Sequence, residues 1–161
     1  MLRGSNVRPD RVKIAIVLLW VVIMANGIEA QELANYRELL ADYDPGLTAI
    51  AALDRNGGDW AAGVEALWSE SNAPASFGRG RQLWDTLLKV LRQELCGDEG
   101  VRAQFQEYSK NPSSAPLLTG LIVTVTTTAG IPIDPAIATI VVLYLVKIGL
   151  NVFCEYTEPK E

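Results

Sequence analysis

Residues that could carry out chemistry are scarce, because this sequence of 161 residues contains no histidine. Histidine supplies the base in most serine and cysteine nucleophile mechanisms and is a common zinc ligand. The acidic pairs Asp42/Asp44 and Asp98/Glu99 lie at expected turns and helix ends, where carboxylates commonly act as caps. Nothing in the sequence places two of these carboxylates on opposite sides of a cleft, as a glycosidase would require. We therefore expect no enzyme activity, no metal, no cofactor and no small-molecule substrate.

The two cysteines, Cys96 and Cys154, are the remaining reactive groups. Their spacing matches no metal-binding pattern, and a thiolate nucleophile would lack a histidine base. Both lie at expected helix ends next to water. If both face an oxidising compartment they can form a disulfide, and we treat this disulfide as a hypothesis.

One polar stripe interrupts the apolar carboxyl-terminal part of the chain. Its members follow one another at spacings of three and four residues and so share a helix face: Tyr144, Lys147, Asn151 and Glu155. A lysine within an apolar helix is costly and suggests a role in a pore, a pathway or a subunit contact. The simpler interpretation is that Lys147 reaches water at the helix end, about 10 Å away, while its neighbours pack against another helix.

The stripe belongs to a predicted hydrophobic helical hairpin in residues 112–161. Pro116–Pro132 and Pro135–Phe153 contain 17 and 19 residues, which gives helices of about 25 and 28 Å. Asp134 followed by Pro135 is a typical helix start. The hairpin predicts two membrane helices. The alternatives are a strand over 121–128, which is rich in β-branched residues, and a hairpin buried at the centre of a helical bundle.

Small residues in the first hairpin helix predict its packing surface. Gly120, Thr124 and Thr128 recur every four residues, the spacing that lets helices approach closely in lipid. We therefore predict that the two hairpin helices pack through these three positions.

Residues 1–30 consist of a basic flank and a second apolar stretch. Val12–Ala30 contains 19 residues, about 28 Å of helix, close to the roughly 30 Å of a bilayer core. This predicts an uncleaved membrane anchor. A cleaved signal peptide, with Ala25-Asn26-Gly27 and Ile28-Glu29-Ala30 as candidate sites, and a buried helix are the alternatives. The opening Val7-Arg8-Pro9, with Val12, Ala15 and Leu18-Leu19-Trp20, resembles the first span of many small bacterial inner-membrane proteins.

Residues 31–111 predict a small acidic helical domain. Thirteen acidic residues against eight basic ones give it a charge of −5, with no clustered basic face for nucleic acid. Asp59 is the expected N-cap of a helix carrying Trp60, Val64, Leu67 and Trp68. The strongest apolar stripe comprises Leu83, Trp84, Leu87, Leu88, Leu91 and Leu95. The segment Asn72–Gly80 is expected to be a loop.

Together these features predict an all-α protein with an N-terminal membrane anchor helix, a small helical middle domain and a C-terminal hydrophobic helical hairpin. The basic flank should stay in the cytoplasm, which places residues 31–111 outside it at a bacterial inner membrane. We expect a protein-interaction or complex-accessory module whose partners are the lipid bilayer and a second protein or a second copy. The alternative is a small pore-forming or permeabilising protein that uses the hairpin.

Overall fold

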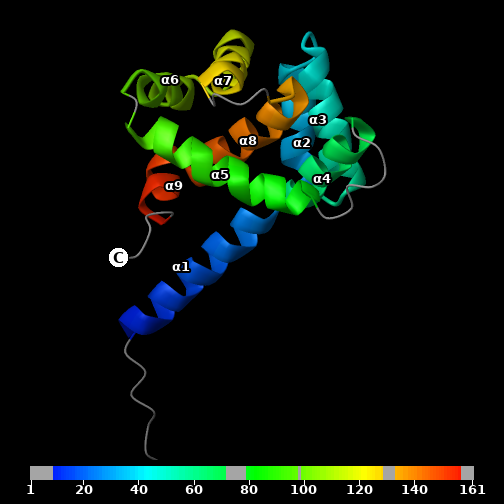
Figure 1. Cartoon of the computed structure of the whole chain (residues 1–161). Helices are drawn as coiled ribbons and strands as arrows, with labels where there is room; N and C mark the ends of the chain where they lie inside the picture. Colours follow the sequence, from blue (N-terminus) through cyan, green and yellow to red (C-terminus); the bar gives the residue numbers. More distant parts are fainter. Residues whose placement is uncertain (1–8, 72–78, 98, 129–132, 157–161) are drawn as a thin grey trace, which may run out of the picture.

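The computed structural model describes residues 9–71, 79–97, 99–128 and 133–156, and the regular secondary structure in these ranges is helical throughout. The all-α prediction is therefore confirmed for this part of the chain. The helices, in chain order, are α1 (Pro9–Asn26), α2 (Ala30–Leu39), α3 (Asp44–Arg55), α4 (Trp60–Ser71), α5 (Arg79–Gly97), α6 (Glu99–Lys110), α7 (Ala115–Thr128), α8 (Pro135–Ile148) and α9 (Leu150–Tyr156) (Figure 1).

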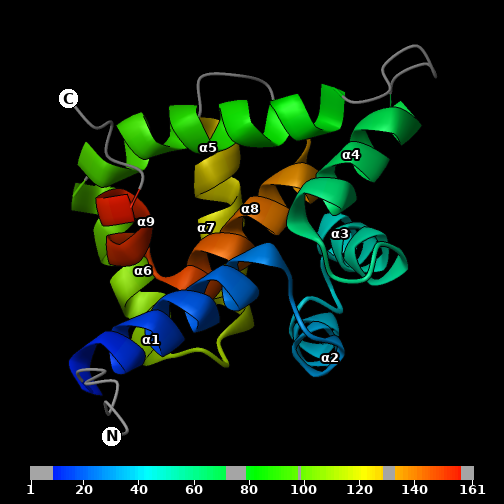
Figure 2. The ribbon, with the colours of Figure 1, turned by 90° about the horizontal axis from the view of Figure 1, so that it is seen from below.

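Helix α8 lies in the middle of the bundle in both views (Figures 1 and 2). It packs against α3, α4 and α7, and more lightly against α1 and α9. The residues from Ala136 to Leu143 are all buried, because a helix that is apolar on every side needs cover on every side. The predicted cap is confirmed: an oxygen of the Asp134 carboxylate accepts the Ala136 N–H at 2.8 Å, and Pro135 is the first helical residue.

The helices around α8 are amphipathic, and their inner faces are those that the 3.6-residue period predicts. On α5 the buried residues include Trp84, Leu87, Leu91 and Leu95, and on α6 they are Val101, Phe105 and Tyr108. Asp59 caps α4 as predicted, since its Oδ1 accepts the Ala62 N–H at 2.9 Å. The buried residues form one core that extends from Ile28 to Phe153 and includes parts of both the middle region and the hairpin.

The second hairpin helix is shorter than the sequence predicts, and this corrects the expectation of one membrane-length helix over 135–153, whereas residues 129–132 of the first predicted helix lie outside the described part of the chain. Helices α7 and α8 contain 14 residues each, about 21 Å. The predicted helix 135–153 is interrupted because Gly149 has φ +86°, a conformation that favours glycine, and α9 continues separately. Among the residues described, we find no helix whose length and apolar character together suffice for a membrane crossing.

Helix α1 differs from the others because it runs away from the bundle (Figure 1). Its apolar side chains Val12, Ile14, Ile16, Val17, Leu18 and Leu19 are between 43% and 59% exposed. The chain returns to the bundle immediately after α1, where Ile28 is buried and Gly27 forms an isolated β-bridge with Asp59. The expected loop Asn72–Gly80 lies largely outside the described residues, except that Arg79 and Gly80 belong to α5.

Candidate functional site

The lysine of the predicted stripe forms an ion pair with the first turn of α2. Lys147 Nζ lies 2.8 Å from Glu32 Oε1, and the two side chains are 9% and 37% exposed. The ammonium group is thus covered by protein and its charge is balanced by a carboxylate 115 residues away in the sequence. This contact differs from the predicted extension of the lysine to water at the helix end. No local sequence signal identifies Glu32, because the pairing depends on where the tertiary fold places α2 relative to the end of α8.

Two tyrosines extend the polar cluster from Glu32 toward α6. Tyr36 lies one turn after Glu32 on α2, and its phenol is close enough to that of Tyr108 on α6 for each to influence the pKa of the other. The Tyr108 hydroxyl in turn donates to the Pro112 carbonyl at 3.0 Å. Burial, with smaller contributions from Tyr108 and Glu32, holds the pKa of Tyr36 well above its usual range. Burial also raises the pKa of Tyr108. Both phenols therefore stay neutral at physiological pH and serve as hydrogen-bonding groups.

These residues line an open groove of about 540 Å³ between α2, the α6–α7 connection and the end of α8. We call it the α2 groove. Its lining residues are Glu32, Asn35, Tyr36, Glu38, Leu39, Tyr108, Pro112, Ser113 and Val146. The lining combines two carboxylates, an amide and two phenols with apolar surface, and it contains no basic side chain. Such a surface accepts hydrogen bonds from ammonium or guanidinium groups, and the partly exposed ring of Tyr36 offers them an aromatic face, whereas Tyr108 is buried.

The side chains at the α2 groove are poorly suited to catalysis. The amine nearest to it, on Lys147, is paired with Glu32 and is not free to act as a nucleophile. The tyrosine pKa values are raised, which moves them away from the range of a general base. Within the described ranges, no three His, Cys, Asp or Glu side chains are grouped so that they could hold a metal ion. The arrangement fits binding better than a reaction.

The structure divides the predicted polar stripe among three environments. Tyr144 is partly buried against the core, with its ring edge-on to Trp60 and Trp84 at centroid distances of 5.6 and 5.0 Å. Burial raises its pKa. Lys147 lies beside the α2 groove, whereas Asn151 and Glu155 are exposed on α9. The break at Gly149 separates the two pairs, so the four residues do not form one site.

The predicted small-residue interface is not where α7 packs. Gly120 is exposed, and a Cβ atom added there would meet nothing within 4 Å. Thr124 Oγ1 contacts Gln104 Oε1 of α6 at 2.9 Å, and the side chain of Thr128 lies outside the described part. The buried face of α7 is formed by the large residues Leu118, Leu121, Ile122 and Val125. Burial of apolar area holds this bundle together, which favours large side chains at the contact, whereas small residues matter where lipid removes that driving force.

The two cysteines lie together at the end of the bundle. Cys96, near the end of α5, and Cys154 of α9 form a disulfide with a Cα–Cα distance of 5.8 Å. Helix α9 contains only seven residues, too few for a stable isolated helix. The disulfide, together with the buried side chains of Leu150 and Phe153, holds α9 against the bundle.

Comparison with known proteins gives no relative for this chain. No protein family model, no curated protein and no solved structure matches it. The function must therefore be inferred from the contacts of its own residues, above all from the exposed surface of α1 and the polar lining of the α2 groove.

Proposed function

We propose that this protein is an exported helical domain that α1 holds at a membrane and that binds a partner protein through the α2 groove. The observation that carries the proposal is the exposed apolar surface of α1, in a protein whose other described helices bury nearly all their large apolar residues. Contiguous exposed apolar surface marks membrane or protein interaction sites.

The composition of α1 favours lipid as the material that covers it. Its exposed apolar residues, from Val12 to Leu19, lie beside the exposed cations Arg11 and Lys13. Long basic side chains can place their charges at lipid headgroups while the apolar part of the helix enters the acyl region. Anionic headgroups add to the attraction, at about 1 kcal/mol for each basic residue near the surface.

The disulfide supports export from the cytoplasm. Disulfides persist in oxidising compartments and are rare where cellular reductants keep thiols reduced. Cys96 and Cys154 are both only partly buried, so a reducing environment would have access to them. A basic flank before the apolar stretch of α1 is also the usual arrangement of an export signal or a signal anchor.

The chemistry of the α2 groove favours a partner segment that carries lysine or arginine. Glu38 is exposed at the groove and, unlike Glu32, has no ion pair with Lys147. Tyr36, which is partly exposed, supplies a neutral phenol ring and hydroxyl, and tyrosine is enriched at protein interfaces. A basic peptide segment would complement the carboxylates, and this complementarity mainly sets specificity and the rate of association.

Membrane fractionation and site-specific crosslinking of the full chain in cells test both parts of the proposal. We expect the protein to sediment with membranes, and a photoreactive residue at Asn35, in the α2 groove, to give a defined crosslinked product. The same residue at the exposed position Gln93 of α5 should not give it, and Glu38→Lys should abolish it. A protein released by salt alone, or crosslinks equal at Asn35 and Gln93, would contradict the proposal.

A second candidate function is permeabilisation of a bilayer, and the burial of α8 favours it. Every residue from Ala136 to Leu143 is apolar except Thr139, whose hydroxyl donates to the Pro135 carbonyl at 2.8 Å. A helix of this kind could exchange its protein cover for lipid. Dye release from liposomes separates the candidates: the interaction module should leave vesicles intact, and leakage at low protein-to-lipid ratio would favour the second function.

A further inference from the structure

The segment that follows α1 is docked on the turn between α3 and α4. The Ile28 N–H donates to the Gly58 carbonyl at 2.9 Å, and Gly27 forms a β-bridge with Asp59. The Ile28 side chain is only 5% exposed and belongs to the core. We call this contact of residues 27–28 with residues 58–59 the clasp.

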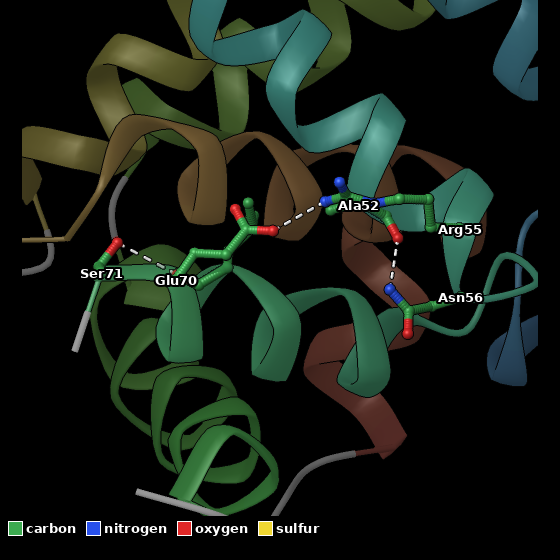
Figure 3. Close-up of polar contacts among 6 residues, drawn as sticks. Ala52, Arg55, Asn56, Glu70 and Ser71 are labelled. Atoms are coloured by element: carbon green, nitrogen blue, oxygen red, sulfur yellow. Dashed lines mark hydrogen bonds and ion pairs between the residues drawn. The ribbon is translucent and has the colours of Figure 1, made fainter. Parts of the chain in front are cut away.

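The turn that receives Ile28 is fixed by contacts of its own. The Gly58 N–H donates to the Leu53 carbonyl at 2.8 Å, and the Gly57 N–H donates to the Asp54 carbonyl at 3.3 Å. This pair of hydrogen bonds is the Schellman ending of a helix. Figure 3 shows two further contacts at this end of α3: Asn56 Nδ2 donates to the Ala52 carbonyl at 2.7 Å, and Arg55 pairs with Glu70 of α4 at 2.9 Å.

Gly58 is the residue that allows the clasp to close. It has φ +81°, and a Cβ atom at this position would overlap the Ile28 carbonyl oxygen. Its neighbour Gly57 also has a positive φ, +65°, but a Cβ atom there would meet nothing within 4 Å. Both positions favour glycine because of their backbone conformation, and only Gly58 needs it for the close approach of another segment.

We infer that the folded domain begins at Ile28, so that any peptidase processing of the exported chain ends at or before the Gly27–Ile28 bond. This inference holds whether or not α1 is retained. It separates the two candidate signal-peptidase sites, because cleavage after Gly27 removes the Gly27–Asp59 bridge but keeps the buried Ile28 and its hydrogen bond to Gly58, whereas cleavage after Ala30 removes both halves of the clasp. At the first site water is added across the amide, which leaves a carboxylate on Gly27 and an amino group on Ile28. That amino group can still donate to the Gly58 carbonyl.

Cleavage after Ala30 would also damage the α2 groove. The Glu29 carbonyl accepts the Leu33 N–H at 3.0 Å, the first hydrogen bond of α2. Glu32, which holds Lys147, lies in the same first turn. Loss of residues 28–30 would therefore remove a buried side chain, a backbone hydrogen bond and the start of the helix that positions the groove.

Identification of the N-terminal residue tests the inference directly. The full chain is produced in cells that export it, and the N-terminus of the recovered protein is determined by mass spectrometry. We expect a first residue at or before Ile28. A first residue at Gln31, or anywhere after Ile28, would overturn the inference. A chain that begins at Ile28 would support this inference and contradict tethering by α1, so the two proposals fail separately.

A matched pair of glycine variants tests whether the clasp holds the junction. The full chain is treated with a Glu-specific endopeptidase, and cutting after Glu29 is followed by mass spectrometry. We expect Gly58→Ala to raise the cutting rate roughly tenfold, because the clasp must open, and Gly57→Ala to change it by less than about threefold. Equal rates in the two variants would overturn the role of the clasp, since both carry the same kind of backbone strain.

Discussion

Helices α1 and α8 are both strongly apolar, but they differ in how far their apolar side chains are buried. Helix α8 is enclosed by α3, α4 and α7, and its residues from Ala136 to Leu143 are buried. Helix α1 leaves the bundle, and residues such as Ile14 and Leu19 are 59% exposed. Apolar composition alone therefore does not decide burial, because a helix is buried only if other elements supply the apolar surface that covers it.

The basic residues of the two helices also differ in their environments. Lys147, the one basic residue of α8, is covered and paired with Glu32. Arg11 and Lys13 of α1 are exposed. A charge inside a bundle needs a partner because desolvation is costly, whereas a charge in water or at headgroups does not. This contrast suggests that α8 contributes to the stability of the fold and α1 to its location.

The largest expected effect comes from the disulfide, because the loop it closes contains α8 and leaves α1 outside. The separation of 58 residues between Cys96 and Cys154 predicts a loss of about 4 kcal/mol of unfolding free energy on reduction. Urea unfolding of the full chain, followed by tryptophan fluorescence with and without reductant, measures this change. Membrane association through α1 should be unaffected. A loss of unfolding free energy below about 1 kcal/mol, or release of the protein from membranes on reduction, would contradict the contrast between α8 and α1.

A matched pair of isoleucine variants compares the two helices directly. Ile140→Ala in α8, where the side chain is fully buried, should lower the unfolding free energy by about 3 kcal/mol. Ile16→Ala in α1, where the side chain is 49% exposed, should lower it by less than about 0.5 kcal/mol. In a liposome flotation assay the second variant should bind roughly tenfold more weakly, because less apolar surface enters the lipid. Similar unfolding costs in both variants would show that α1 packs in the core.

The charges of the two helices give a smaller difference. Glu32→Gln leaves the covered Lys147 ammonium without its carboxylate and should lower the unfolding free energy by about 2 kcal/mol. Lys147→Met should lower the unfolding free energy by less, since Glu32 is 37% exposed and remains hydrated. Lys13→Met in α1 should change stability by less than about 0.5 kcal/mol. Urea titrations of the three variants provide the test, and an equal cost for Glu32→Gln and Lys13→Met would show that the ion pair contributes nothing.

The smallest expected change in unfolding free energy concerns the packing of α7 against α8. Gly120→Ala should raise the unfolding free energy by about 0.5 kcal/mol, because alanine favours the helix and its methyl group meets no neighbour. Ile122→Val, on the buried face, should lower it by about 1 kcal/mol. Thermal unfolding monitored by circular dichroism is sensitive enough for both changes. A destabilising Gly120→Ala would instead favour packing through the small residues.

Local features of the sequence predicted much of the fold. The caps at Asp59 and Asp134, the amphipathic face of α5 and the all-α class depend on residues within a few turns of one another. The structure then brings Cys96 and Cys154 into a disulfide, which the sequence could offer only as a hypothesis because bonding requires two distant segments to meet.

The candidate site was only partly predictable. The sequence singles out Lys147 as an unusual residue, but its partner Glu32 lies 115 residues away, and the α2 groove draws its lining from three separate parts of the chain. The packing face of α7 was misplaced for a related reason. A row of small residues is a strong indication of close helix contact where lipid surrounds the helix, and the sequence of α7 alone does not specify its surroundings.

The sequence by itself determined the all-α class of the described residues, the caps at Asp59 and Asp134 and the apolar face of α5, because these features depend on residues within a few turns of one another. Only the tertiary structure decided that α8 is covered while the apolar residues of α1 from Val12 to Leu19 are exposed, that Ile28 closes against Gly58, and that Glu32 meets Lys147. Each of these results depends on apolar area or a charged partner supplied by segments distant in the sequence, and local periodicity carries no information about them.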